Sequence, residues 1–238
     1  KVTNYELTAR DRDARETVVS YNATTFYDRD RRLQGVFAAA RDITERKLAE
    51  KQILDLALHD SLTRLPNRRL LTDRLAQTMA ASKRSGRYSA LMFMDLDNFK
   101  SLNDVHGHYM GDLLLVEVAR RISSGVREAD VVARFGGDEF VVILSELDLD
   151  RSASTTQAGL VAEKLRASLD KPYFLTFKKE GKTDLTVEHH CTASIGVVMF
   201  VNHDESQDHL LKWADAAMYQ SKAAGGNQVL FSDAKDTA

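Results

Sequence analysis

The feature that most constrains the fold is a pair of apolar runs separated by a short polar segment. Residues 131–133 and 140–144 are apolar, and the segment between them contains Gly136, Gly137, Asp138 and Glu139. Short apolar runs bounded by glycine are typical of buried strands, and adjacent glycines suit the positive φ values of tight hairpin turns. The sequence therefore predicts a β-hairpin whose turn carries two carboxylates. On this segment alone, a solvated turn with two surface acids is a sufficient explanation.

The remaining pattern predicts helices and strands in alternation. Strands are expected at 16–26, 35–40, 88–94, 192–201 and 228–231, and helices from Pro66 to Gly86 and at 110–125, 158–169 and 209–224, with a polar stretch up to about 188. Leu114, Val118 and Ile122 recur every fourth residue, as they do on one face of a helix. Strands that alternate with helices, together with a hairpin, indicate an α+β fold (an α/β sandwich) with helices on a central sheet.

Composition limits the classes of protein that the chain can belong to. Of its 238 residues, 43% are hydrophobic and 29% are charged, which is typical of a globular domain. Thirty-three basic and 35 acidic residues give a net charge of −2, so no overall basic field predicts DNA or RNA as a partner. A single cysteine, Cys191, cannot form an intrachain disulfide, which favours a cytoplasmic location. The chain starts without Met and in mid-pattern, so we expect it to be part of a longer protein with additional domains. Whether that longer protein is anchored in a membrane is left open by the sequence.

Residues 43–58 are expected to form a connecting helix. Asp42 can cap it, with Glu45 three residues later in a capping-box arrangement. A short heptad-like pattern is formed by Arg46, Ala49, Ile53 and Leu56, which follow one another at intervals of three, four and three residues. Two heptads fit a surface helix of a single domain and also a short coiled coil that pairs with a second copy, and the pattern leaves both open.

Two further carboxylates, Asp95 and Asp97, lie where an apolar run ends. Charges inside a buried strand are costly, so acids at a strand end are either solvated loop residues or ligands. For an isolated D-x-D the loop interpretation is favoured. With the hairpin acids nearby, a cluster of oxygen ligands suited to Mg²⁺ or Mn²⁺ becomes the better interpretation, and the glycines let a polyanion approach the backbone.

At this point the chain resembles a known family. "GGDEF" at 136–140 is similar to the defining motif of the GGDEF-domain diguanylate cyclases, and "DLDNFKSLNDVHGHYMGD" at 95–112 is similar to a second motif of that family. "HDSLTRLPNRRLL", "TASIGV" and "ADAAMYQSKAAGGN" follow the family order. The resemblance covers about residues 57–232. It implies a nucleotide-cyclase, palm-like central sheet in a domain at 59–238, and the condensation of two GTP molecules into cyclic di-GMP and two pyrophosphates.

The resemblance also implies roles for individual residues. The metal, Mg²⁺ or Mn²⁺, would be bound by Asp95, the backbone carbonyl of Leu96, Asp138 and Glu139. The catalytic residues would be Asp138, also a candidate base for the attacking 3′-hydroxyl, with Glu139 and Lys100. The substrate-binding residues would be Asn103, His108, Asp112, Gly136, Gly137 and Lys222. In that set Asn103 and Asp112 would read guanine, whereas Lys100 and Lys222 would contact phosphates.

A second, regulatory site is implied by "READ" at 127–130, which resembles the family's R-x-x-D inhibitory motif. Arg127 and Asp130 would bind the product, with Arg134 joining them from a neighbouring surface. A surface ion pair on the loop is the alternative.

One position departs from the family: Gly226 stands where a basic residue is usual. Losing one cation from a triphosphate site costs about 1–3 kcal/mol by analogy with other charged hydrogen bonds, which predicts weaker GTP binding.

The resemblance extends to assembly and to the N-terminus. Residues 1–42, most clearly 35–47, resemble the C-terminal part of a PAS sensory domain, and no PAS ligand is implied by so short a fragment. Because each cyclase domain would hold one GTP, the active form would be a homodimer. The alternative function is a weak or inactive GGDEF module that binds GTP or cyclic di-GMP and regulates a neighbouring domain.

Overall fold

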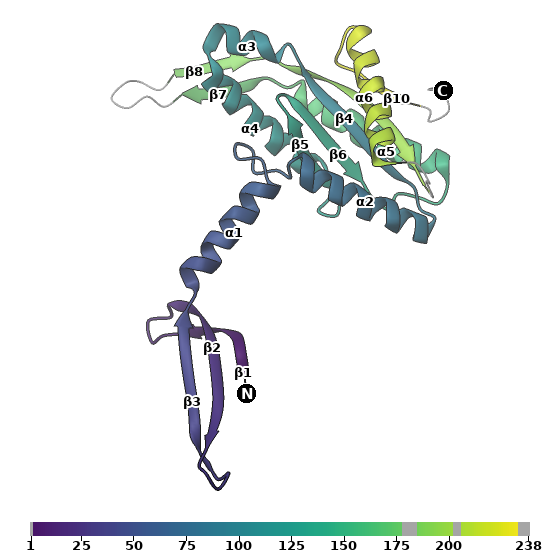
Figure 1. The fold of residues 1–238 in the computed structure, drawn as a ribbon. Helices are drawn as coiled ribbons and strands as arrows, with labels where there is room; N and C mark the ends of the chain where they lie inside the picture. The colour runs from purple at the N-terminus through teal and green to yellow at the C-terminus, as the bar shows by residue number, and fades with distance from the viewer. Residues whose placement is uncertain (1, 178–184, 202–205, 233–238) are drawn as a thin grey trace. The chain divides into compact units, whose positions relative to one another are not determined.

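The computed structural model describes residues 2–177, 185–201 and 206–232, and the chain divides into two units, Lys1–Ala57 and Leu58–Ala238. In the N-terminal unit, strands β1 (Val2–Arg10), β2 (Glu16–Tyr27) and β3 (Leu33–Asp42) form an antiparallel sheet in the order β1-β2-β3 (Figure 1). Helix α1 (Thr44–Leu58) follows. Asp42 Oδ1 accepts a hydrogen bond from the backbone N–H of Thr44, the first residue of α1, at 2.9 Å. Asp42 itself ends β3, and the return contact expected from Glu45 stays a prediction.

The C-terminal unit is built on a five-stranded mixed sheet. Its strands are β4 (Ser89–Asp97), β5 (Val131–Gly136), β6 (Glu139–Leu144), β9 (Thr192–Phe200) and β10 (Val229–Ser232), in the order β10-β9-β4-β6-β5. β10 runs parallel to β9, and the other neighbours are antiparallel. The predicted hairpin is β5 and β6, and its neighbour β4 is the central strand. The predicted α+β class is thereby confirmed.

Helices cover both faces of this sheet (Figure 1). They are α2 (Arg68–Ser85), α3 (Phe99–His106), α4 (His108–Gly125), α5 (Arg151–Leu169) and α6 (Gln207–Ala223). Helices α2 and α6 pack on one face, whereas α3, α4 and α5 pack on the other. Asn67 caps α2, which was not predicted from the sequence, and Gly86 ends the helix at φ +71°, as predicted. Within the described residues, no helix combines the length and the apolar character that a bilayer crossing needs.

The structure differs from the sequence expectations at several elements. Helix α3 was not expected, because its eight residues are too few for a clear period; the buried side chain of Leu102 anchors it. Helix α5 begins at Arg151, earlier than expected, because Asp150 caps it. The stretch expected to be polar contains a small hairpin of β7 (Tyr173–Phe177) and β8 (Leu185–His189), and residues 178–184 of that stretch lie outside the described residues.

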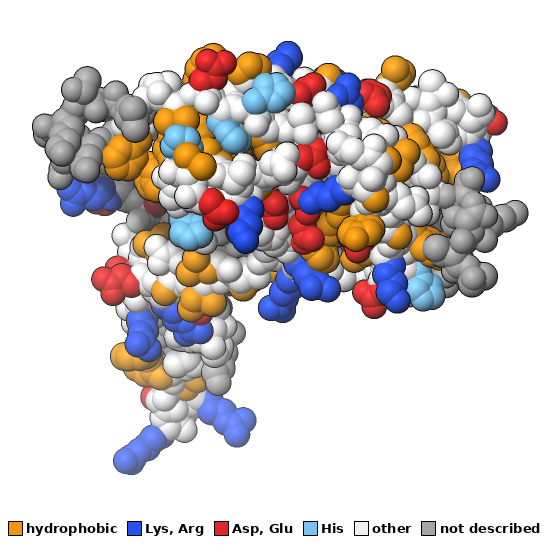
Figure 2. Space-filling view, turned by 90° about the horizontal axis from the view of Figure 1, so that it is seen from above, with side chains coloured by type: hydrophobic (Ala, Val, Ile, Leu, Met, Phe, Trp, Pro, Cys, Tyr) orange, Lys and Arg blue, Asp and Glu red, His pale blue; other side chains and the backbone are white. Residues whose placement is uncertain are grey.

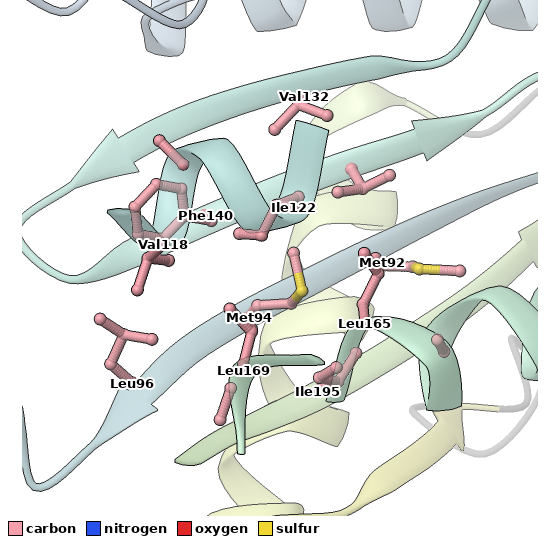
Figure 3. Packing of buried hydrophobic residues seen from close by; sticks show 14 of the residues in the cluster. Met92, Met94, Leu96, Val118, Ile122, Val132, Phe140, Leu165, Leu169 and Ile195 are labelled. Carbon is pink, nitrogen blue, oxygen red and sulfur yellow. The ribbon is translucent and has the colours of Figure 1, made fainter. Parts of the chain in front are cut away.

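The core fixes β4 between two hydrophobic layers. Residues 89–94 are at most 3% exposed. Met92, Met94 and Leu96 point into the layer formed with α4 and α5, which Figure 3 shows from close by. Leu91 and Phe93 point into the layer formed with α2 and α6. A strand that is buried on both faces has room for charge only where it emerges, and β4 emerges at Asp95 and Asp97.

Gly196 in β9 provides a test of this packing. A Cβ there would overlap the backbone of α6 at Ala214 and Met218. We expect Gly196→Ala to lower the free energy of unfolding by about 1–3 kcal/mol or more, since backbone cannot move as a side-chain end can. Chemical denaturation measures the change. The control is Gly159→Ala on α5, where a Cβ would make ordinary contacts with Phe231 and should stabilise by about 1 kcal/mol. Similar effects of the two changes would contradict the packing described here.

Candidate active site

Three acidic side chains gather where β4 and β6 end together. Asp95 pairs directly with Glu139 across the two strands, and Asp138 precedes Glu139 in the turn. Directly opposed residues on antiparallel strands hold their side chains on one face, within contact range. Lys222, in the last turn of α6, forms an ion pair with Asp95 at 2.5 Å. The structure therefore brings together four of the predicted site residues from three elements.

The electrostatics of this cluster favour a bound cation. Burial raises the pKa of Asp95, the hydrogen bond from Lys222 opposes that change, and the charge of Asp138 adds to it. Burial is also the largest cause that raises the pKa of Glu139. The charges of Asp95, Asp215 and Asp138 raise it further. Carboxylates crowded in this way are costly to ionise together, and a divalent cation relieves that cost. Within the described residues, no group of three or more acidic, His or Cys side chains is arranged so that it could hold a metal ion.

The turn between β5 and β6 is held by Arg134. Gly137 has φ +51°, whereas Gly136 ends β5 outside the left-handed region, so only one of the two glycines has the expected positive φ. Arg134 donates from Nε and Nη2 to the carbonyl of Gly137 at 3.0 and 2.7 Å. Its Nη1 donates to both oxygens of Asp60 at 3.0 and 3.1 Å. The guanidinium therefore joins the turn to the segment that precedes α2.

Asp60 is a residue that sequence reasoning did not single out. Burial raises the pKa of its carboxyl, but hydrogen bonds from Thr63 and Arg134 outweigh burial, and the pKa lies below its usual value. The backbone N–H of Arg134 also donates to the carbonyl of Pro66 at 3.0 Å. The only sequence signal was the position of Asp60 within the matched segment 59–71. Nothing local in the sequence indicates its partner, which lies 74 residues away.

Four of the residues predicted to bind the nucleotide lie on α3 and α4. Asn103 on α3 packs against Gly111 on α4 so closely that a Cβ at position 111 would overlap its amide. The Oδ1 atom of Asn103 is buried and has no hydrogen-bond partner in the described structure. Because this oxygen faces Gly111 and is buried, it is not accessible to a bound molecule in this conformation, and the guanine contact of Asn103 stays a prediction. Lys100, His108 and Asp112 are exposed on the same two helices.

The R-x-x-D segment lines the wall of an open groove. Asp130 Oδ2 accepts from the backbone N–H of Arg127 at 3.0 Å, which shapes the loop between α4 and β5. Arg127 and Asp130 line a groove of about 540 Å³ together with Arg74 of α2, which sequence reasoning missed. Arg134, expected to join them, directs its donors to Asp60 and Gly137, and its part in product binding stays a prediction.

Gly226 lies in the turn between α6 and β10 with φ +74°. A Cβ there would lie 3.0–3.1 Å from the carboxylate of Asp97, so a basic residue at 226 would need a strained backbone next to that carboxylate.

Cys191 also lies near the site. Burial and then the charge of Asp97 raise the pKa of the Cys191 thiol to about 12. This thiol is therefore neutral and unsuited to act as a nucleophile.

Charges of both signs are interspersed on the face shown in Figure 2. Together, the strand-end carboxylates, the adjacent lysine and the glycine turn form a charged cluster at one end of β4 in an α+β domain. Comparisons with known proteins identify the family of this domain. The profile of the family described as "Diguanylate cyclase, GGDEF domain" matches residues 57–228. The chain belongs to this family.

Several relatives illustrate the similarity. The bifunctional diguanylate cyclase/cyclic di-GMP phosphodiesterase MucR of Pseudomonas aeruginosa is 40% identical over 80% of this chain and 26% of its own length. Diguanylate cyclase TpbB of the same organism is 39% identical over 70% of this chain and 35% of its own length. The chain thus spans about a quarter to a third of these curated relatives.

Solved structures show the same fold. The GGDEF domain of TpbB (YfiN) from Pseudomonas aeruginosa superimposes with a TM-score of 0.65 at 36% identity, covering 75% of this chain and 96% of that chain. The coiled coil and GGDEF domain of DgcB from Caulobacter crescentus, in complex with c-di-GMP, gives a TM-score of 0.67 at 27% identity, covering 80% and 93%.

The ion pair between Asp60 and Arg134 predicts a pH dependence of stability. The pKa of Asp60 is lower in the folded chain than in the unfolded chain, so the stabilisation is present above about pH 4 and is lost as the pH falls through the folded-state value. We expect Asp60→Asn to lower the free energy of unfolding by about 1 kcal/mol at pH 7, because the pair is partly open to solvent. The difference from the unmodified chain should shrink below about pH 4.

Denaturation at a series of pH values measures this difference. Glu128→Gln, which changes an exposed carboxylate, is the matched control and should leave stability nearly unchanged. A deficit of Asp60→Asn that stays the same from pH 7 down to pH 3 would contradict the assignment.

Proposed function

We propose that the C-terminal unit, with the domain boundaries expected at 59–238, condenses two GTP molecules into cyclic di-GMP. In this reaction each 3′-hydroxyl attacks the α-phosphate of the other nucleotide. Two phosphodiester bonds form and two pyrophosphates leave. The observation that carries the proposal is the cluster of Asp95, Asp138 and Glu139 beside Lys222 at the ends of β4 and β6. Relatives described as diguanylate cyclases give it a second support.

The donor set fits Mg²⁺ or Mn²⁺. We assign Asp95, Asp138 and Glu139 as its carboxylate ligands, with the backbone carbonyl of Leu96 as a further oxygen. Hard oxygen donors suit these ions, which keep positions for substrate phosphates. When bound, the metal lowers the pKa of the 3′-hydroxyl and stabilises the leaving pyrophosphate. Asp138 is placed to accept the hydroxyl proton, although a carboxylate that binds metal is a weak base.

The remaining residues bind and orient the nucleotide. The amide of Asn103, whose Oδ1 has no partner in the described structure, is proposed to turn toward the guanine edge, and the exposed Asp112 supplies a second acceptor. Adenine presents a different arrangement of hydrogen-bond donors and acceptors on the same edge, which Asn103 and Asp112 would not match. These two residues would therefore select GTP over ATP. Lys222 and Lys100 offset the charge of the triphosphate, Gly136 and Gly137 let it approach the backbone, and His108 supplies a further polar contact.

Product inhibition is assigned to the groove at Arg127. A planar guanidinium suits phosphates and the Hoogsteen edge of guanine. Arg127 and Arg74 lie in one groove with Asp130, so two cations are available to a dianionic ligand. The structure of DgcB with c-di-GMP indicates that a relative binds this molecule.

Two cyclase domains are needed, because each is expected to hold one GTP. We propose a homodimer in which the chains face each other across a two-fold axis. In α1, Ile53 and Leu56 are 66% and 64% exposed, as expected for a helix that pairs with a second copy. The sheet of the N-terminal unit leaves Val36 and Phe37 exposed, which fits the C-terminal part of a PAS-like domain whose other strands cover it.

A second candidate function is a GGDEF module that binds GTP or cyclic di-GMP without turnover. The observation that favours it is Gly226, which supplies no cation where the family has one. Asp95, Lys100 and the intact "GGDEF" favour the enzyme.

Incubation with Mg²⁺ and GTP tests the enzyme proposal. We expect cyclic di-GMP to accumulate, and Asp138→Ala to lower kcat by about 10²-fold or more because a metal ligand and the candidate base are lost. Chromatography of the nucleotides measures the product. Asp208→Ala, which removes an exposed carboxylate at the opposite end of α6 from Lys222, is the control and should retain activity. Tight GTP binding with no product at high protein concentration would instead support the binding module.

Product feedback makes a separate prediction. Arg127→Ala should raise the cyclic di-GMP concentration that gives half inhibition by about tenfold or more, because one charged hydrogen-bond donor is lost. Initial rates measured with added product give this value. Arg120→Ala, which removes an exposed arginine of α4, is the matched control. Unchanged inhibition in Arg127→Ala would exclude this groove as the product site.

A further inference from the structure

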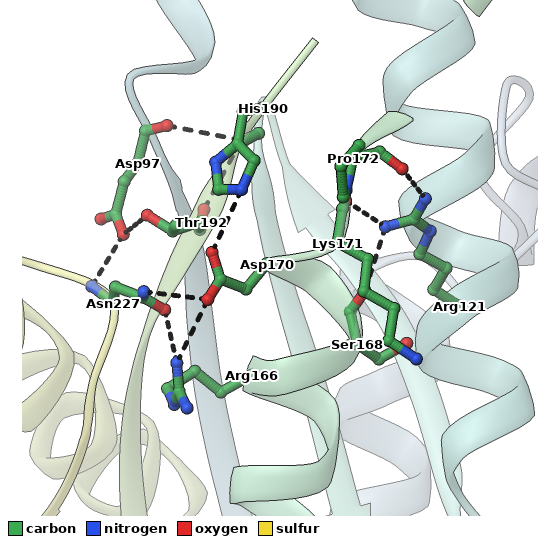
Figure 4. Close-up of polar contacts among 11 residues, drawn as sticks. Asp97, Arg121, Arg166, Ser168, Asp170, Lys171, Pro172, His190, Thr192 and Asn227 are labelled. Atoms are coloured by element: carbon green, nitrogen blue, oxygen red, sulfur yellow. Dashed lines mark hydrogen bonds and ion pairs between the residues drawn. The ribbon is translucent and has the colours of Figure 1, made fainter. Parts of the chain in front are cut away.

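Asp97 differs from Asp95 although both lie at the end of β4. Its carboxylate accepts three hydrogen bonds: from Thr192 Oγ1 at 2.6 Å, from Ser194 Oγ at 2.8 Å and from the backbone N–H of Asn227 at 2.9 Å. Figure 4 shows Asp97 between Thr192 and Asn227. The first two donors belong to β9, and the third belongs to the turn that follows α6. Asp97 is therefore neither a solvated loop residue nor an available metal ligand.

The turn that Asp97 holds has an unusual backbone. Gly225, Gly226 and Asn227 have φ values of +113°, +74° and +52° in succession. Residues other than glycine avoid this region, and a turn of this kind persists only where its surroundings fix it. Arg166 of α5 donates to Asn227 Oδ1 at 2.8 Å (Figure 4), and Ser221 donates to the carbonyl of Gln228 at 2.8 Å. Asp97 supplies the contact from the central strand.

Lys222 depends on the position of this turn. It lies in the last turn of α6, and its carbonyl accepts from the backbone N–H of Gly225 at 3.1 Å. Its ammonium reaches Asp95, two residues before Asp97 on the same strand. Asp97 therefore ties the end of α6 to the strand that carries Asp95, and a shift of the turn moves the ammonium away from the carboxylate cluster.

We propose that Asp97 is a positioning residue for the cyclase reaction: it fixes the turn at 225–227 and so holds Lys222 at the phosphate site. The role of Lys222 in phosphate binding rests on the proposed function. The contacts by which Asp97 holds the turn at 225–227 do not depend on it. Asp97 Oδ2 accepts from Thr192 and Asn227, and its Oδ1 accepts from Ser194. An amide at position 97 could keep all three contacts, because its oxygen can replace Oδ2 and its N–H₂ group can donate to the Ser194 hydroxyl, so Asp97→Ala is the change that removes them.

The kinetic test is a double-mutant cycle of Asp97→Ala and Lys222→Ala, measured as kcat/KM for cyclic di-GMP formation. Asp97→Ala alone should lower kcat/KM by about 10–100-fold, because all three hydrogen bonds to the turn and to β9 are lost and a charge misplaced by about 1 Å costs about this much. In the Lys222→Ala background the same change should cost less than about threefold, because the lysine that it positions is absent. An equal loss in both backgrounds would overturn the proposal.

A second measurement does not depend on activity. The rate at which an amine-reactive reagent modifies Lys222, followed by peptide mass spectrometry, reports how firmly its ammonium is held. Asp97→Ala should raise this rate several-fold, whereas modification of the exposed Lys212 on the same helix should stay unchanged. An unchanged rate at Lys222 would overturn the positioning role even in an active protein. Absence of cyclic di-GMP in the unmodified chain would overturn the cyclase proposal and leave this measurement valid.

If Asp97→Ala does not fold, Thr192→Val removes one of the three donors at nearly constant volume. It should raise the modification rate of Lys222 by a smaller factor. The matched control is Ser154→Ala, which removes a buried hydroxyl of α5 that bonds to Asp148 and should leave Lys222 as slow to react as before. Faster modification in both variants would indicate general loosening and would contradict a specific role for Asp97.

Discussion

The burial of β4 on both faces is the constraint on which the site depends. The strand lies between β6 and β9, and residues 89–94 are almost fully covered by helices on either side. Each large apolar side chain buried there contributes about 1.5–3 kcal/mol, whereas a charge in the same place would cost more than its neighbours can offset. Acidic residues on this strand are therefore confined to its end. The same confinement brings them close to Glu139 and Lys222.

Much of this arrangement follows from local sequence. The glycine pair between two apolar runs predicted the hairpin, and the apolar run before Asp95 predicted a strand that ends in carboxylates. Once β4 and β6 are neighbours, the opposition of Asp95 and Glu139 follows from register. The class of fold and the acidic cluster were predictable because both come from periodicity and from the cost of burying charge.

The supporting contacts were not predictable, because their partners are far apart in the chain. Asp97 bonds to Asn227, 130 residues away, and nothing in "DLD" distinguishes the carboxylate that is held from the one that is available. Arg134 is a basic residue next to a glycine turn. The neighbouring sequence does not indicate that its guanidinium donates to the carbonyl of Gly137. Helix α3 and the β7–β8 hairpin were missed because they are too short for their own periodicity to identify them.

The contact between Arg134 and Asp60 has a consequence for where the catalytic domain begins. A fragment that started at α2 would keep every acidic residue of the cluster and the whole central sheet. It would lack Asp60 and the carbonyl of Pro66, which bond to Arg134. The conformation of the Gly137 turn would then rest on fewer contacts. Such a fragment would also lack Leu62 and Leu65, which pack against the hydrophobic core, so the loop before α2 contributes both to the core and to the turn beside the acidic cluster.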